Sequence, residues 1–230
     1  MPLLSQFPDK VGRHTLLLLC LIATMVGLPL LEDLPIGRIL LSAWFLVTSG
    51  VLLASLSGTG RGHRILIVAG GIFCAMLLGN LVVEAAGRDS QSLQMIALPY
   101  GVLFLAWVSG LILFSILHAQ RVTPDLISGA VVAYMLLGIC WGGLYIFLEI
   151  LNEGSFSFGE GGRELSSLFY YSFVTLTTLG YGDILPLGKV ARTAAYLEAV
   201  TGVMFTAILI AGLVGKVRLQ REKVDPPVSE

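Results

Sequence analysis

Six long apolar segments dominate the sequence, and they leave few choices for its fold. They run over residues 15–31, 39–56, 65–86, 93–117, 126–151 and 193–217, and short polar stretches separate the first five. Because a membrane helix needs about 20 mainly apolar residues, each segment predicts one span. The charged content of 13% is about half of the roughly 25% found in soluble domains. We therefore expect an all-α membrane protein with six transmembrane helices.

The basic residues indicate the orientation of the six spans. If both termini lie on the same side of the membrane, nine of the 14 Lys and Arg residues fall on that side and five on the other. Because cytoplasmic loops carry an excess of Lys and Arg, we expect a multi-pass protein of the cell membrane with both termini in the cytoplasm. Residues 1–14 would form the cytoplasmic N-terminus and residues 218–230 a cytoplasmic tail. The net charge of −1 gives no indication of a nucleic-acid partner.

The longest interruption lies between the fifth and sixth spans, and it is not uniformly polar. Its residues 164–177, "ELSSLFYYSFVTLT", are apolar and aromatic but too short to cross a membrane. They predict a short re-entrant helix that begins near Glu164 and ends at the threonines, in the middle of the membrane. Because a helix C-terminus carries roughly half a negative charge, we expect this end to favour a cation.

This helix is followed by "TLGYGD", in which two glycines alternate with a leucine and a tyrosine. Glycine adopts positive φ without steric cost, so successive backbone carbonyls can point to one side. A ring of such strands would form stacked cages of oxygens that replace the water shell of a dehydrated cation. One chain supplies one strand, so a ring needs several chains. The predicted ion-binding residues are Thr178, Leu179, Gly180, Tyr181 and Gly182, with Asp183 near the outer mouth.

The stretch "TTLGYGD" resembles the potassium-channel signature TVGYG. The aromatic helix before it and the membrane helix after it extend this similarity to about residues 122–217, which would form a pore domain of outer helix, pore helix, selectivity filter and inner helix. The resemblance implies K+ as the permeant ion, no cofactor, and four identical subunits in membrane lipid, so that each chain has three identical partners. It implies that K+ is held by carbonyls of Thr178, Leu179, Gly180 and Tyr181, and that the filter is supported by Thr177, Tyr170, Tyr171 and Asp183.

Residues 15–118 resemble the four-helix peripheral domain of voltage-gated relatives, in which the fourth helix carries arginines at every third position. Here the fourth span, residues 93–117, holds no Lys, Arg, Asp or Glu. We therefore expect a bundle that is built like a voltage sensor but lacks the sensing charges. Within the filter motif, Leu179 replaces the usual valine, and its carbonyl would serve equally well.

Two residues of the last span are candidates for a role in gating. Gly202 lies 19 residues after Asp183, where such channels commonly carry a hinge glycine. Close packing against the pore helix is an equally good reason for a glycine there. Glu198 is an ionisable residue inside a span, and such residues are functional candidates by default. It would either face the ion or form a buried brace behind the filter.

These observations predict a potassium-selective channel that conducts K+ passively. The alternatives are a weakly selective cation channel and a non-conducting accessory subunit of another channel. An intramembrane enzyme would need a nucleophile with its base, or a metal site, at membrane depth. The three histidines and three cysteines are scattered along the chain, and no carboxylate pair falls within the spans. We therefore expect no enzymatic activity.

Overall fold

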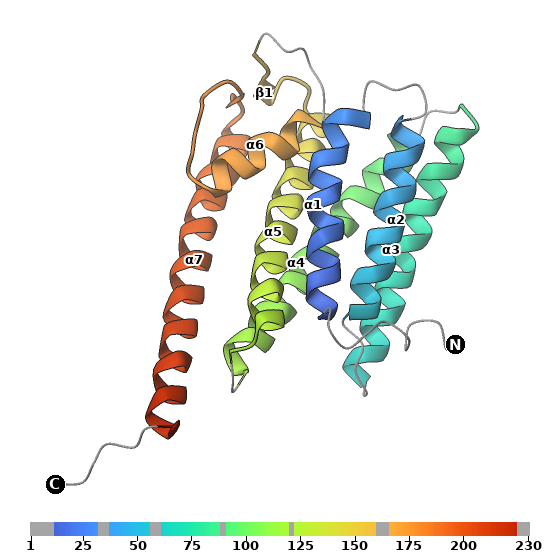
Figure 1. Ribbon diagram of the computed structural model, residues 1–230. Helices are drawn as coiled ribbons and strands as arrows, with labels where there is room; N and C mark the ends of the chain where they lie inside the picture. The colour runs from blue at the N-terminus through green and yellow to red at the C-terminus, as the bar shows by residue number, and fades with distance from the viewer. Residues whose placement is uncertain are drawn as a thin grey trace, which may run out of the picture. The chain divides into compact units, whose positions relative to one another are not determined.

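The computed structural model describes residues 12–31, 37–55, 61–87, 91–119, 122–159 and 166–224. In these ranges, seven helices are joined by irregular segments and by one pair of two-residue strands (Figure 1). The chain divides into a peripheral unit, Met1–Phe104, and a pore unit, Leu105–Glu230. The boundary falls inside the fourth helix. The predicted helical fold is therefore confirmed in the described part of the chain, with the small strand pair as the exception.

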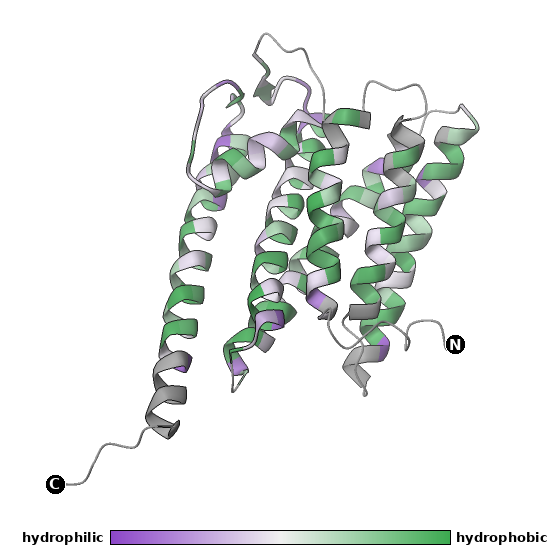
Figure 2. Cartoon of the chain, viewed as in Figure 1, coloured by the Kyte–Doolittle hydropathy of each residue, from purple (hydrophilic) through white to green (hydrophobic). Residues whose placement is uncertain are grey.

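Four of the six predicted spans are confirmed as helices long and apolar enough to cross a membrane. Figure 2 shows their mainly hydrophobic colouring. The first two helices have 19 residues each, but the apolar stretches described in them, His14–Gly27 and Ala43–Leu53, are shorter than the roughly 20 residues of a span. Those two spans therefore stay predictions. The four long apolar stretches are Arg64–Val83, Ser92–His118, Pro124–Leu151 and Lys189–Lys216.

The peripheral unit contains α1 (Arg13–Leu31), α2 (Gly37–Ser55), α3 (Arg61–Ala85) and the first part of α4 (Gln91–His118). Helix α2 packs against both α1 and α3. The indole Nε1 of Trp44 donates to Thr24 Oγ1 at 2.9 Å and joins α2 to α1. The other contacts between α1, α2 and α3 are mostly between apolar side chains. Such contacts are less directional than hydrogen bonds.

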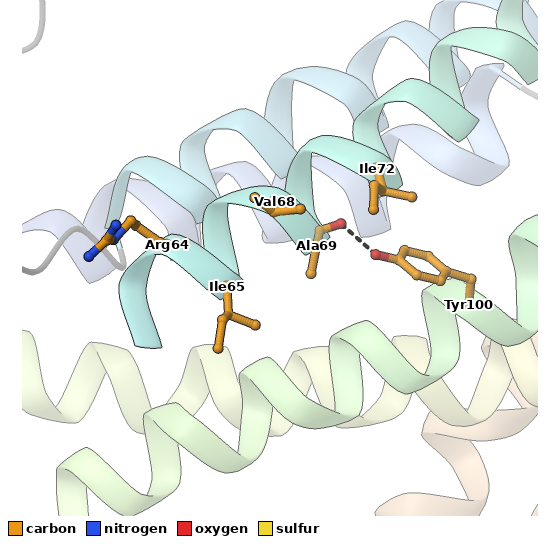
Figure 3. Close-up of a pocket in the computed structure, with 6 residues that line it drawn as sticks. All are labelled: Arg64, Ile65, Val68, Ala69, Ile72 and Tyr100. Carbon is orange, nitrogen blue, oxygen red and sulfur yellow. Dashed lines mark hydrogen bonds between the residues drawn. The ribbon is translucent and has the colours of Figure 1, made fainter. Parts of the chain in front are cut away.

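A shallow apolar groove of about 340 Å³ lies along α3 in the same unit (Figure 3). The hydroxyl of Tyr100, on α4, closes part of it by donating to the Ala69 carbonyl at 2.7 Å. Because the hydroxyl of Tyr100 has a hydrogen-bond partner on the α3 backbone, the side chain can lie in apolar surroundings. The remaining lining residues are Arg64, Ile65, Val68 and Ile72.

The pore unit contains the rest of α4, then α5 (Pro124–Leu151), β1 (Phe156–Ser157), α6 (Ser167–Leu176), β2 (Leu185–Pro186) and α7 (Lys189–Val224). Helix α5 has a strong start signal: Thr123 Oγ1 accepts from the Leu126 amide at 3.2 Å, Pro124 follows at the first position, and Asp125 lies in the first turn. In Figure 1, α6 lies across the upper ends of α5 and α7.

The two short strands pair antiparallel, with Phe156 opposite Pro186. They join the segment after α5 to the segment after the glycine motif. A buried carboxylate strengthens this corner, because Glu149 accepts from the Gly154 amide at 3.0 Å and from the Phe156 amide at 3.1 Å. The loop that follows the motif is therefore held to the C-terminal end of α5.

Glycines of α5 bring α6 close to it. A Cβ at Gly138 would meet the ring of Phe173, and one at Gly142 would meet the ring and the Cα of Phe169. Close helix approach through glycine suits a short helix that must be held at membrane depth. Glu164, the predicted start of this helix, lies outside the described residues. Helix α6 begins at Ser167 and ends at Leu176, among the threonines where its end was predicted.

The far end of α7 is attached to the end of α4. Lys216 Nζ donates to three carbonyls there, Ile116 O and Leu117 O at 2.8 Å and Ala119 O at 2.5 Å. A lysine ammonium has three protons, so these contacts use all of them. The positive charge also stabilises the negative end of the α4 dipole.

Candidate functional site

The chain leaves α6 through a tightened turn. The amide of Thr177 donates to Phe173 O at 3.1 Å and that of Thr178 to Thr175 O at 2.9 Å. The next two amides, of Leu179 and Gly180, both donate to Val174 O, at 2.9 and 3.3 Å. The amides of residues 177–180 thus point back to the helix end, which is the negative end of its dipole.

The sign of φ alternates along residues 178–182, which we name the filter segment. Thr178, Gly180 and Gly182 have φ of 59°, 60° and 79°, while Leu179 and Tyr181 between them have no positive φ. Glycine adopts this conformation freely, but a residue with a side chain is strained in it. Thr178 is the non-glycine residue of the described part that has a positive φ. Backbone strain of this kind clusters at functional sites.

Within the described part of the single chain, no donor reaches the carbonyls of the filter segment. Among the described residues, no hydrogen bond is accepted by a carbonyl of residues 177–182. The segment is exposed in the single chain, and Leu179 and Tyr181 show 55% and 67% of their surface. A strip of free carbonyls on an exposed, strained strand can coordinate a cation, provided that other groups complete the shell.

Two of the residues predicted to support the filter contact each other. The hydroxyl of Tyr170 donates to Asp183 Oδ2 at 2.7 Å, and the amide of Ile184 donates to Asp183 Oδ1 at 3.0 Å. The bond from Tyr170 lowers the pKa of Asp183, and the same bond raises the pKa of Tyr170 to about 12. A negative carboxylate is therefore maintained next to the end of the filter segment.

The neighbouring tyrosine faces a different environment. The ring of Tyr171 is buried against Tyr145 and Phe156, with ring centroids 5.1 and 5.5 Å away. This aromatic cluster fixes α6 against α5 and β1. Thr177, also predicted as filter support, directs its hydroxyl back to Phe173 O at 2.6 Å.

Helix α7 approaches the end of α6 most closely at Gly202. A Cβ there would collide with the carbonyl oxygen of Leu176, the last residue of α6. The hydroxyl of Tyr134 on α5 donates to the same oxygen at 3.2 Å. The structure thus gives the close-packing explanation for Gly202 a specific contact, while the hinge stays a prediction.

Glu198 is fully buried behind the filter segment, with 0% of its surface exposed. The hydroxyl of Tyr145 donates to Oε2, and Ser172 Oγ lies 2.5 Å from Oε1. Ser172 Oγ also lies 2.8 Å from the carbonyl oxygen of Gly138. Of the two roles predicted for Glu198, this geometry fits the buried brace.

Three helices each contribute two positions one turn apart to this region, which we name the three-helix contact. Sequence reasoning found only the positions on α7. The others are polar or glycine residues within apolar helices, a weak signal that gains meaning only once the helices are packed. The three-helix contact comprises Tyr134 and Gly138 of α5, Ser172 and Leu176 of α6, and Glu198 and Gly202 of α7.

Comparison with known proteins identifies the segment that contains these features. Residues 133–218 match the model of a family described as ion channel. The match begins in α5, includes α6 and the filter segment, and ends in α7. It overlaps most of the pore domain predicted over residues 122–217. The match is to a family of channels and not of enzymes, which agrees with the expectation from the sequence.

One curated relative is the voltage-gated potassium channel Kch of Escherichia coli (strain K12). It is 27% identical to this chain over 160 residues, which are 63% of this chain and 36% of the relative. The chain thus matches little more than a third of that relative's length. No solved structure gives a significant match.

Proposed function

We propose that this protein is a potassium-selective channel that conducts K+ passively across the cell membrane. The observation that carries the proposal is the alternating sign of φ in the filter segment, which starts at the C-terminus of a short helix between two membrane helices. The distant similarity to a potassium channel supports the choice of ion. The ion-binding atoms would be the carbonyl oxygens of Thr178, Leu179, Gly180 and Tyr181.

Four copies of the chain would surround one pathway. One filter segment provides one side of each oxygen cage, so a single chain cannot replace the hydration shell of an ion. In a homotetramer, the four α6 helices would direct their negative ends to the same axis and lower the energy of a cation there. Gly182 would let the strand turn outward, and Asp183 would keep negative charge at the outer mouth.

Both termini would lie in the cytoplasm, because this orientation places most Lys and Arg residues there. Voltage would not act through α4, since its stretch 93–117 contains no formal charge. The stimulus that opens the channel would then act elsewhere, for example through lipid, protons or a ligand.

The test is a current measurement on purified protein in lipid bilayers under opposed K+ and Na+ gradients. We expect the reversal potential to follow the K+ gradient, and the mass of the detergent-solubilised protein to correspond to four copies. A reversal potential between those of the two ions would indicate a weakly selective cation channel. An intact tetramer without current would favour an accessory subunit.

A further inference from the structure

We propose that Glu198 is protonated in the conducting channel, and that its carboxylic acid group positions the pore helix by donating a hydrogen bond to Ser172. The inference rests on the proposed channel function for its effect on current. Glu198 would then be a positioning residue, because it touches α6 and not the ion. Loss of this proton at alkaline pH would then disturb the filter.

The first argument is a count of protons. Ser172 Oγ lies within hydrogen-bond distance of two oxygens, Glu198 Oε1 at 2.5 Å and Gly138 O at 2.8 Å. A serine hydroxyl has one proton to donate. If Glu198 were a carboxylate, both neighbours would be acceptors, and one of these two close contacts would have no proton.

The acid form removes this conflict. The Glu198 carboxyl group donates its proton to Ser172 Oγ, and the Ser172 hydroxyl donates to Gly138 O. The hydroxyl of Tyr145 donates to the other carboxyl oxygen. Each of the three contacts then contains one proton, and they form a continuous chain from α7 through α6 to α5.

The second argument is the surroundings of the group. Glu198 has no exposed surface, and no Lys, Arg or His of the described residues pairs with it. A buried charge without a partner costs several kcal/mol, so the neutral acid is the favoured form. The titratable side chains that face it are phenols and a thiol on α5 and a phenol on α6, all neutral at pH 7: Tyr134, Cys140, Tyr145 and Tyr171.

The third argument is what the contact holds in place. Ser172 and Leu176 lie one turn apart on α6, and Glu198 and Gly202 meet them from α7. Thr177 follows directly, and the filter segment begins one residue later. A shift of α6 at Ser172 would therefore move the base of the filter. Loss of the Glu198 proton would place two acceptors and an unpaired charge at this point.

The experiment compares infrared spectra and currents of two variants. In Glu198→Gln the amide can donate to Ser172 and accept from Tyr145, so the variant imitates the acid form but has no proton to lose. The control is Glu149→Gln, which alters another buried carboxyl group. Glu149 accepts from two backbone amides, which is the hydrogen-bond pattern of a carboxylate.

We expect the tetramer to show the carbonyl stretching band of a protonated carboxylic acid at neutral pH. Glu198→Gln should remove this band and Glu149→Gln should leave it. As pH rises, the wild-type band should disappear together with the current, whereas Glu198→Gln should keep its current. A spectrum that Glu198→Gln leaves unchanged would overturn the proposal, as would an alkaline loss of current that persists in this variant. Because the infrared band does not depend on conduction, it tests the proton even if the protein is not a channel.

Discussion

The peripheral and pore units are both helical and apolar, but the interactions that stabilise each unit internally differ. In an 18-residue apolar window of α5, 56% of the residues are buried within the single chain, against 17% in α7 and 11% in α3. Polar contacts between α5, α6 and α7 meet in the three-helix contact, whereas α1, α2 and α3 are joined mainly by apolar side chains and by the bond from Trp44 to Thr24. Directional bonds fix positions that apolar packing only approximates. The comparison therefore predicts that function is sensitive to small changes in the pore unit and tolerant of change in the peripheral unit.

The largest effect should come from the filter segment. Gly180→Ala or Gly182→Ala places a side chain at φ of 60° or 79°, which costs about 1–2 kcal/mol per residue, repeated in every subunit. We expect loss of K+ selectivity or of current, measured as reversal potential in K+ and Na+ gradients. The control is Gly110→Ala in α4, where a Cβ meets no atom within 4 Å. Unchanged selectivity in both filter variants would mean that these residues do not line the pathway.

The second-largest effect distinguishes the two explanations for Gly202, a hinge in α7 and close packing against α6. Alanine in a helix normally stabilises by about 1 kcal/mol relative to glycine, so a hinge glycine replaced by alanine should alter gating without loss of stability. Here the added Cβ would collide with the Leu176 carbonyl oxygen. We expect Gly202→Ala to lower the stability by about 1–3 kcal/mol per chain, as overpacking does, and to change open probability.

Thermal unfolding of the tetramer measures this effect. Gly212→Ala is the matched control on α7, because its Cβ would lie 3.1 Å from a flexible leucine side chain, that of Leu117. If Gly202→Ala is as stable as the wild type and only its gating changes, the hinge explanation is correct and the packing explanation is wrong.

The location of the segment that matches the ion channel family could be predicted from the sequence because local chemistry determines it. Alternating glycines after a run of threonines require an unusual backbone, and the short aromatic stretch before them is too short to span. The partners of Glu198 could not be predicted, since Tyr145 and Ser172 lie 53 and 26 residues away and resemble ordinary polar residues in apolar helices. The same holds for the contact of Lys216 with the end of α4. In the peripheral unit, the first two spans are predicted from hydropathy alone. Hydropathy does not determine where a helix ends.

A smaller effect is expected at the outer mouth. The bond from Tyr170 holds the pKa of Asp183 below its usual value, so the carboxylate keeps its charge until the pH falls through this lowered pKa. Tyr170→Phe removes the bond and should return the pKa of Asp183 towards its ordinary value. The mouth would then lose its charge at a higher pH, and external acid would reduce the current earlier in a titration from neutral to acidic pH.

The measurement is K+ current against external pH, and the expected result is an upward shift of the midpoint in Tyr170→Phe. Tyr196→Phe is the control, because Tyr196 is exposed on α7 and its hydroxyl makes no hydrogen bond to another described residue. An unchanged midpoint would show that Asp183 does not influence the permeating ion.

The smallest effect should be that of voltage, and it tests the peripheral unit directly. The relative from Escherichia coli is named a voltage-gated channel. A charge that crosses the field gains about 2.3 kcal/mol per 100 mV, and sensors move three or four charges in each of four subunits.

Movement of α4 would contribute almost nothing, since residues 93–117 carry no formal charge. Lys216, which donates to carbonyls at the C-terminal end of α4, belongs to α7 and not to α4. We therefore expect open probability in symmetrical K+ to vary shallowly with voltage, on the order of one or two effective charges. A steep curve would mean that a charged segment other than α4 crosses the field.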